Sequence, residues 1–194
     1  MESEYAHDYS IARGKDDWRV TPERHAVIVG GCHAIDLLRW IAGNPTEVYA
    51  ISNHKCLTDW PVDDCSVAVM KFPNDVNGKV FTSIGCKREY TMRSCFYGTK
   101  GTIICDNKSA YLTLYECGED VYGSKMYTMP QMIPVKIQNH NTVEEIDTFI
   151  KAIINDEDLP ISSMEGASTV AVCCAVVESC ETGKPVEIVY PKVK

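Results

Sequence analysis

The fold of this chain is decided by one stretch, residues 30–43, which reads Gly-Gly-Cys-His-Ala-Ile-Asp-Leu-Leu-Arg-Trp-Ile-Ala-Gly. Its apolar residues recur at helical spacing, and Gly43 then provides a helix stop. The stretch therefore predicts an amphipathic helix, with one apolar stripe formed by Ile35, Leu38, Ile41 and Ala42.

Upstream of this stretch the sequence leaves two interpretations open. Residues 21–23, Thr-Pro-Glu, have the pattern of a helix start, with Thr as the N-cap and Pro at the first helical position. Residues 25–31 fit either a short buried strand, because they are rich in β-branched side chains, or the first turns of the same helix. We favour one helix over residues 22–42. Its two glycines, Gly30 and Gly31, cost roughly 1 kcal/mol each inside a helix, which indicates that another part of the chain packs closely there.

Downstream of residue 46 the apolar pattern changes to a period of two, which is typical of strands. Hairpin turns are expected at 74–78 and 98–101, and two helices, each opened by a capping box, at 142–155 and 163–182. The segment 64–72 is apolar on both faces, so we expect helices on one side of a sheet and a partner subunit on the other. Strands are predicted at 2–9, 46–54, 64–72, 78–86, 91–97, 101–105, 109–116, 134–137 and 186–189.

The composition of the 194-residue chain argues against several classes of function. Its formal net charge of −8 provides no basic stripe to neutralise phosphates, which argues against a nucleic-acid partner and against an anionic membrane surface. No apolar run approaches the roughly 18 residues of a membrane span. The ten cysteines have neither zinc-site nor disulfide-framework spacing, so no metal is expected. We interpret them as small buried residues in a reducing compartment and predict a cytoplasmic protein.

Residues 26–31 superficially have the pattern of a dinucleotide-binding turn, an apolar run followed by two glycines. The third glycine is missing, and the positions about twenty residues further on hold Asn53 and His54 instead of an acid. We therefore expect no NAD or NADP to bind to this chain alone.

His33 is the strongest candidate for chemistry. Gly31 stands beside it, so a cofactor or ligand could approach the imidazole closely. Asp36 lies three residues further along the helix, where it could contact a substrate or orient the ring. A single helical histidine near an aspartate is more often structural, and the residues alone leave that alternative open.

Two other pairs of side chains could bind a sugar or a polyol. Tyr5 and His7 share one face of the first predicted strand and could hydrogen-bond a polyol, or they could belong to an exposed strand face. Trp18 and Arg19 could stack on and hydrogen-bond a sugar, or they could pack within their own loop.

Four short stretches, in order along the chain, carry a resemblance to a known family. They are residues 30–43 followed by Glu-Val-Tyr-Ala at 47–50, Asp-Asp-Cys-Ser-Val-Ala at 63–68, Tyr-Gly-Thr-Lys-Gly-Thr at 97–102, and Thr-Gly-Lys-Pro-Val at 182–186. Together they resemble the C-terminal domain of the glucose-fructose oxidoreductase / inositol dehydrogenase (Gfo/Idh/MocA) family.

The resemblance implies an α+β fold, with an open, mostly antiparallel β-sheet, helices packed on one face and a homodimer or tetramer interface on the other. It also implies that residues 1–194 form a single C-terminal substrate-binding and oligomerisation domain. The N-terminal Rossmann domain, which binds NAD or NADP in this family, is absent from the chain. A strand pattern that begins almost at Met1 fits such a domain boundary.

The resemblance places His33 at the family's catalytic histidine. Members pass a hydride between a substrate carbon and the nicotinamide, while a lysine and a histidine assist proton transfer. That lysine belongs to a Glu-Lys-Pro motif of the Rossmann domain, which this sequence does not contain. Many members also carry an aspartate four residues before the histidine, where this chain has Val29. Asp36 matches a position for which an orienting role is expected.

These observations lead to two hypotheses. In the first, the chain is the substrate-side domain of an NAD(P)-dependent oxidoreductase that acts on a sugar, a polyol or a related small molecule, and it is inactive alone. In the second, it is a free-standing, non-catalytic binding or oligomerisation module of the same fold, which Val29 and the missing lysine favour. A relative that uses NAD for elimination or glycoside hydrolysis is also compatible with the sequence.

Overall fold

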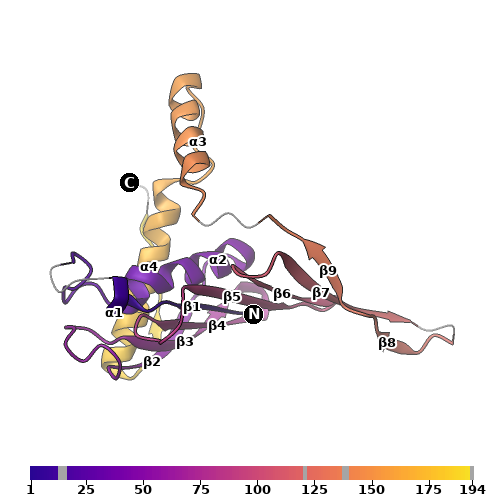
Figure 1. Cartoon of the computed structure of the whole chain (residues 1–194), viewed down its shortest axis with the longest axis horizontal. Coiled ribbons are helices and arrows are strands. Elements are labelled where there is room, and N and C mark those ends of the chain that lie inside the picture. The colour runs from indigo at the N-terminus through magenta and orange to yellow at the C-terminus, as the bar shows by residue number, and fades with distance from the viewer. Residues whose placement is uncertain (13–16, 120–121, 137–139, 193–194) are drawn as a thin grey trace.

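The computed structural model describes residues 1–12, 17–119, 122–136 and 140–192, and an open mixed β-sheet forms its centre (Figure 1). Across these residues the sheet has ten strands, in the order β10-β2-β3-β4-β1-β5-β6-β7-β8, with β9 paired to β7. β1 runs parallel to β4, and the other neighbouring pairs are antiparallel. The predicted α+β class with a mostly antiparallel open sheet is confirmed. The strands are β1 (Glu2–Ala6), β2 (Glu47–Asn53), β3 (Cys65–Phe72), β4 (Val76–Ser83), β5 (Thr91–Tyr97), β6 (Gly101–Asp106), β7 (Tyr111–Glu119), β8 (Lys125–Tyr127), β9 (Gln131–Pro134) and β10 (Val186–Glu187).

Two helices, α2 (Cys32–Ala42) and α4 (Ser163–Thr182), cover one face of the sheet (Figure 1). Ile35 and Leu38 of α2 are fully buried, and so are Val172 and Val176 of α4. Burial of one such side chain stabilises the fold by roughly 1.5–3 kcal/mol, so this core fixes α2 against the sheet. The inward side chains of the central strands that complete the core are Val48, Ala50, Ala68, Met70 and Val80.

A buried arginine ties the two helices together. The Arg39 side chain is 3% exposed, and its guanidinium donates to the Asn44 side chain and to the Thr169 hydroxyl. It also donates to the backbone carbonyl and the carboxylate of Glu165 at 3.0 Å each. Because Arg39 belongs to α2 and Glu165 to α4, these bonds set how the helices lie beside each other.

The chain enters α2 through a wider turn than the sequence predicts. Thr21 to Arg24 form a turn closed by a hydrogen bond of 3.0 Å from the Arg24 amide to the Thr21 carbonyl. Helical conformation begins at Ala26, and the π-helix η1 (Val27–Gly31) leads directly into α2. The prediction of one helix from Pro22 is therefore wrong for residues 22–25, because proline suits the second position of a tight turn as well as a helix start. The alternative of a strand over 25–31 is also wrong.

The close packing expected at the two glycines is confirmed. A Cβ atom on Gly30 would lie 2.3 Å from Cε1 of Tyr5, and one on Gly31 would lie 2.3 Å from Oγ1 of Thr82. Both glycines thus let η1 approach the sheet, Gly30 over β1 and Gly31 over β4.

Other element boundaries differ from the sequence pattern mainly at turns. β1 ends at Ala6 and the short α1 (Tyr9–Ala12) follows, so the predicted strand 2–9 is too long. The β3–β4 connection turns at Pro73–Asp75 rather than at 74–78, with Asn74 and Asp75 at positive φ. β9 starts three residues before the strand predicted at 134–137, whose residue 137 lies outside the described residues, and no pattern predicts β8.

The two C-terminal helices begin and end where the sequence predicts. The Ser162 hydroxyl accepts from the Glu165 amide at 3.4 Å and caps α4, as expected. The Asn141 side chain instead bonds the Glu144 carboxylate, so the capping box predicted for α3 (Thr142–Asn155) is not formed through the backbone. α3 projects away from the sheet (Figure 1). It exposes a row of apolar side chains: Val143, Ile146, Phe149, Ile150, Ile153 and Ile154.

The sheet face opposite α2 and α4 also exposes apolar side chains. Tyr49 and Ile51 of β2 are 41% and 58% exposed, and Val69 of β3, the neighbour of Tyr49 across the strands, is 50% exposed. Contiguous apolar surface of this kind is typical of protein–protein contacts. The partner subunit expected on this face stays a prediction.

Candidate active site

Four rings from different parts of the chain meet around His33, the second residue of α2. The His33 ring stacks on Tyr5 of β1, with centroids 5.8 Å apart and an angle of 23° between the planes. Tyr5 contacts Tyr90 of the β4–β5 connection at 5.3 Å, and Tyr90 stacks on His140 at 5.6 Å and 13°. His140 in turn lies 6.4 Å from His33 in an edge-on arrangement. Each ring therefore contacts the next in a closed circuit, which we call the four-ring cluster.

A line of hydrogen-bonding groups runs from this cluster to the backbone of η1. The Tyr9 hydroxyl donates to the Val29 carbonyl at 3.2 Å and lies 3.0 Å from the Tyr5 hydroxyl, which lies 3.3 Å from Nδ1 of His7. The Tyr9 hydroxyl has one proton and donates it to Val29, so it must accept from the Tyr5 hydroxyl. The Tyr5 hydroxyl then has no second proton to donate and accepts from Nδ1–H of His7. That order leaves Nε2 of His7 as the acceptor nitrogen of its ring.

Tyr5 acts in this line as a neutral phenol. Burial raises the pKa of Tyr5 far above its ordinary value, and the hydrogen bond with Tyr9 raises it further. Tyr5 is only 5% exposed, so the interpretation of residues 5 and 7 as an exposed strand face is wrong for Tyr5. The structure does bring Tyr5 and His7 together, and their role in binding a polyol stays a prediction.

The surroundings of His33 favour its neutral form. Desolvation by the neighbouring groups lowers the pKa of His33 below its ordinary value, and the His140 imidazole lowers it further, whereas the Asp36 carboxylate acts in the opposite direction. Part of the residue nevertheless stays open to solvent. A neutral, accessible imidazole can accept a proton, which is the property that a general base requires.

Asp36 and Gly31 have contacts within the fold that explain them without a ligand. Asp36 accepts a hydrogen bond from the Thr169 hydroxyl and another, at 3.3 Å, from Arg39, so it helps to join α2 to α4. Gly31 is buried against Thr82, which gives the glycine a packing role. The predicted roles of Asp36 toward substrate and of Gly31 toward cofactor stay predictions.

Trp18 and Arg19 contact each other within their loop. The Arg19 guanidinium lies 4.2 Å from the centre of the Trp18 ring, and Arg24 lies 5.0 Å from the same ring. Arg19 also pairs with Asp17 at 3.2 Å. Trp18 is still 57% exposed, so its predicted stacking on a sugar stays a prediction.

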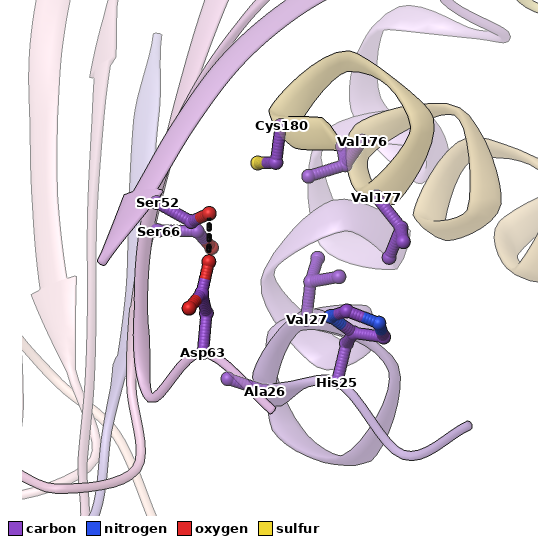
Figure 2. Close-up of a pocket in the computed structure, with 9 residues that line it drawn as sticks. All are labelled: His25, Ala26, Val27, Ser52, Asp63, Ser66, Val176, Val177 and Cys180. Atoms are coloured by element: carbon purple, nitrogen blue, oxygen red, sulfur yellow. Dashed lines mark hydrogen bonds between the residues drawn. The ribbon is translucent and has the colours of Figure 1, made fainter. Parts of the chain in front are cut away.

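Two hollows lie near this region, and only one has the size of a substrate site. A groove of about 1010 Å³ runs from His33 along α2 to the start of α4, at the upper end of the usual range for ligand pockets. The second, between η1, α4 and the sheet, holds about 10 Å³ (Figure 2), space for roughly one water molecule. Its polar lining, where Ser52 donates to Asp63, therefore serves packing. The groove is lined by His33, Asp36, Trp40, Ile161, Glu165 and Val170, among others.

Sequence reasoning missed three members of the site. Tyr9 lies in α1, four residues after Tyr5, so strand alternation does not connect the two. Tyr90 and His140 lie in connections between elements and approach His33 only through the tertiary fold. Periodicity carries no signal for such residues.

The described residues also lack two features. Among the described residues, no group of three or more His, Cys, Asp or Glu side chains is arranged to hold a metal ion. In the same residues, no helix has both the length and the apolar character needed to cross a membrane.

Comparison with known protein families assigns the chain to a class. Residues 1–104 match the model of the GFO/IDH/MocA C-terminal domain. This match covers more than half of the 194 residues, and the chain belongs to that oxidoreductase family. A search of curated proteins finds no match.

Solved structures show the same fold at low sequence identity. Levoglucosan dehydrogenase in complex with NADH is 19% identical, with a TM-score of 0.78 over 98% of this chain and 58% of that one. An oxidoreductase domain protein from Kribbella flavida is 20% identical (TM-score 0.76; 97% and 57%). UDP-N-acetylglucosamine 3-dehydrogenase from Acidithiobacillus ferrooxidans is 18% identical (TM-score 0.74; 93% and 54%). The chain spans less than two thirds of the length of each.

Proposed function

We propose that this chain is the substrate-side domain of an NAD(P)-dependent oxidoreductase that acts on a sugar, a polyol or a related compound by hydride transfer. The observation that carries the proposal is the position of His33. By the resemblance this histidine corresponds to the family's catalytic histidine; it also lines the large groove, and desolvation lowers the pKa of its imidazole.

In this proposal His33 handles the proton and not the hydride. When an alcohol is oxidised, its hydroxyl proton must leave as the carbon gives up a hydride. A neutral His33 accepts that proton, and in the reverse reaction the imidazolium returns it. Stacking on Tyr5 holds the ring in place for either direction.

The proposal assigns the dinucleotide site to another domain. Gly31 is the position predicted to admit the cofactor. Thr82 already occupies the space beside Gly31, because a Cβ atom on this glycine would lie 2.3 Å from the Thr82 hydroxyl oxygen. We infer that NAD or NADP belongs to a separate domain that packs beside the groove. The exposed apolar row on α3 and the exposed Trp40 and Ile161 support this, because surface of that kind is usually covered by another domain or subunit.

The alternative is a non-catalytic binding or oligomerisation module, and one observation favours it. Val29 stands where many relatives carry an acid, and it contributes its backbone carbonyl to Tyr9. Such a module would keep the four-ring cluster as a binding site without using the proton affinity of His33.

The test is to assay the chain alone and then joined to a dinucleotide-binding domain encoded upstream of it or supplied from a relative. We expect no NADH or NADPH formation from the chain alone with a panel of sugars and polyols, and turnover by the joined protein. His33→Gln should then lower kcat by roughly 10²–10⁴-fold, whereas His25→Gln, at the small cavity, should not. Turnover by the chain alone would contradict the domain assignment, and an unaffected His33→Gln enzyme would contradict the role proposed for His33. A joined protein without turnover would favour the non-catalytic module.

A further inference from the structure

His140 reaches the four-ring cluster from a part of the chain far from the other three members. It lies two residues before α3, whereas Tyr5, His33 and Tyr90 all belong to the first half of the sequence. Its backbone has a φ of 47°, in the left-handed region that histidine adopts more readily than most residues. With this backbone conformation, just before the start of α3, the His140 ring lies against Tyr90 and His33.

The contacts of His140 place it directly on the ring that the proposed reaction uses. Its face stacks on Tyr90, with 13° between the planes, and the His33 ring meets it edge-on. Without His140, His33 would contact only Tyr5 among the rings of the cluster. The residue is itself exposed, so it forms the outer side of the cluster.

We propose that His140 is a positioning residue of the His33 site, which closes the four-ring cluster and holds the His33 imidazole in its orientation beside the groove. The inference about catalysis rests on the proposed function of His33. The geometric part does not, because the four rings pack together in the chain without substrate or a second domain.

A positioning role has an electrostatic consequence that a purely structural contact lacks. The His140 imidazole opposes a positive charge on His33, so it helps desolvation to lower the pKa of His33. Removal of His140 should raise that pKa. The other titratable or charged groups around His33 are unchanged by the substitution; they are Tyr5 and His7 near β1, Tyr90 before β5, Cys32, Asp36 and Arg39 of α2, and Glu165 of α4.

The experiment is a pH titration of the histidine side chains by NMR in the chain itself, labelled with ¹⁵N-histidine. His140→Ala removes both the charge and the ring, and His140→Phe removes the charge but keeps a ring to stack on Tyr90. We expect the His33 midpoint to rise in both variants, and to rise more in His140→Ala. Val143→Ala, three residues further on and 81% exposed, is the matched control and should leave His33 unchanged.

The outcomes separate this proposal from the proposed function. A His33 midpoint that is the same in wild type and in both His140 variants would overturn the positioning role while leaving the reaction assigned to His33 intact. An equal shift in Val143→Ala would overturn it as well, because the effect would then belong to the segment and not to the ring. If His140→Ala unfolds the chain, His140→Phe alone decides, by whether its His33 midpoint rises.

Discussion

Replacement of Gly30 by alanine tests whether packing around Tyr5 holds the site together. Alanine favours a helix over glycine by roughly 1 kcal/mol. Against this gain, the new Cβ would lie 2.3, 2.7 and 2.9 Å from three atoms of the Tyr5 ring. Tyr5 cannot move away freely, because it is 5% exposed and its hydroxyl contacts Tyr9. Overpacking costs typically 1–3 kcal/mol, and a buried ring belongs at the upper end, so we expect Gly30→Ala to lower the free energy of unfolding by about 2 kcal/mol.

The matched control for Gly30 is Gly166, in the first turn of α4. No atom lies within 4 Å of a Cβ built there, so Gly166→Ala should gain helix propensity without strain and raise the free energy of unfolding by up to about 1 kcal/mol. Guanidinium denaturation followed by circular dichroism measures both variants, with the slopes compared to confirm a common unfolding transition. Two variants that shift stability in the same direction, or a Gly30→Ala chain as stable as wild type, would refute this account of the site.

Three more predictions follow from single residues. Arg39→Met removes the buried guanidinium that joins α2 to α4, together with its hydrogen bond to the buried Thr169 hydroxyl, and should lower the free energy of unfolding by about 2 kcal/mol. Asp36→Asn, 57% exposed, should cost about 1 kcal/mol or less; equal losses in denaturation would contradict the assignment. The fold lowers the pKa of His33 below its ordinary value of about 6.5, so His33 binds a proton less readily in the folded chain than in the unfolded one. Stability should therefore fall as the pH drops below about 6.5, and His33→Gln should remove that part of the slope; an unchanged slope would show that His33 is unperturbed. Ile51→Lys on the open sheet face should change the free energy of unfolding by less than about 0.5 kcal/mol, but it should reduce any self-association measured by light scattering. If wild type forms oligomers and the variant has the same particle mass, this face is not the interface.

The parts of the fold that sequence reasoning predicts well are those in which a repeating pattern decides the structure. α3 and α4 agree with the predicted ranges because their apolar spacing and their glycine or polar ends coincide. β2 and β3 agree to within one residue at each end, because the buried face of each strand is mostly apolar, and β5 spans the predicted residues 91–97. Two glycines within an otherwise helical run correctly indicated a close approach, since only tight packing offsets their cost.

The parts that sequence reasoning misses are those decided by tertiary contacts. Residues 22–25 have the composition of a helix start, yet they form a turn, because α2 is entered through η1, whose register is set by Tyr5 and Thr82. The site shows the same limit. His33, Tyr5 and His7 have local signals, but Tyr90 and His140 join them only once the sheet and the β9–α3 region are in place.

Val29 bears on the protonation of His33 because its side chain places no charge one helical turn before the imidazole. A carboxylate one helical turn away would favour the imidazolium and raise the pKa of His33. Val29 brings no charge, and its carbonyl is instead occupied by the Tyr9 hydroxyl. Desolvation and, to a smaller extent, the His140 imidazole lower the pKa of His33, and together they outweigh the Asp36 carboxylate, which raises it. These effects favour the neutral imidazole, and in the proposed enzyme a second domain would bring the cofactor and its lysine to this proton acceptor.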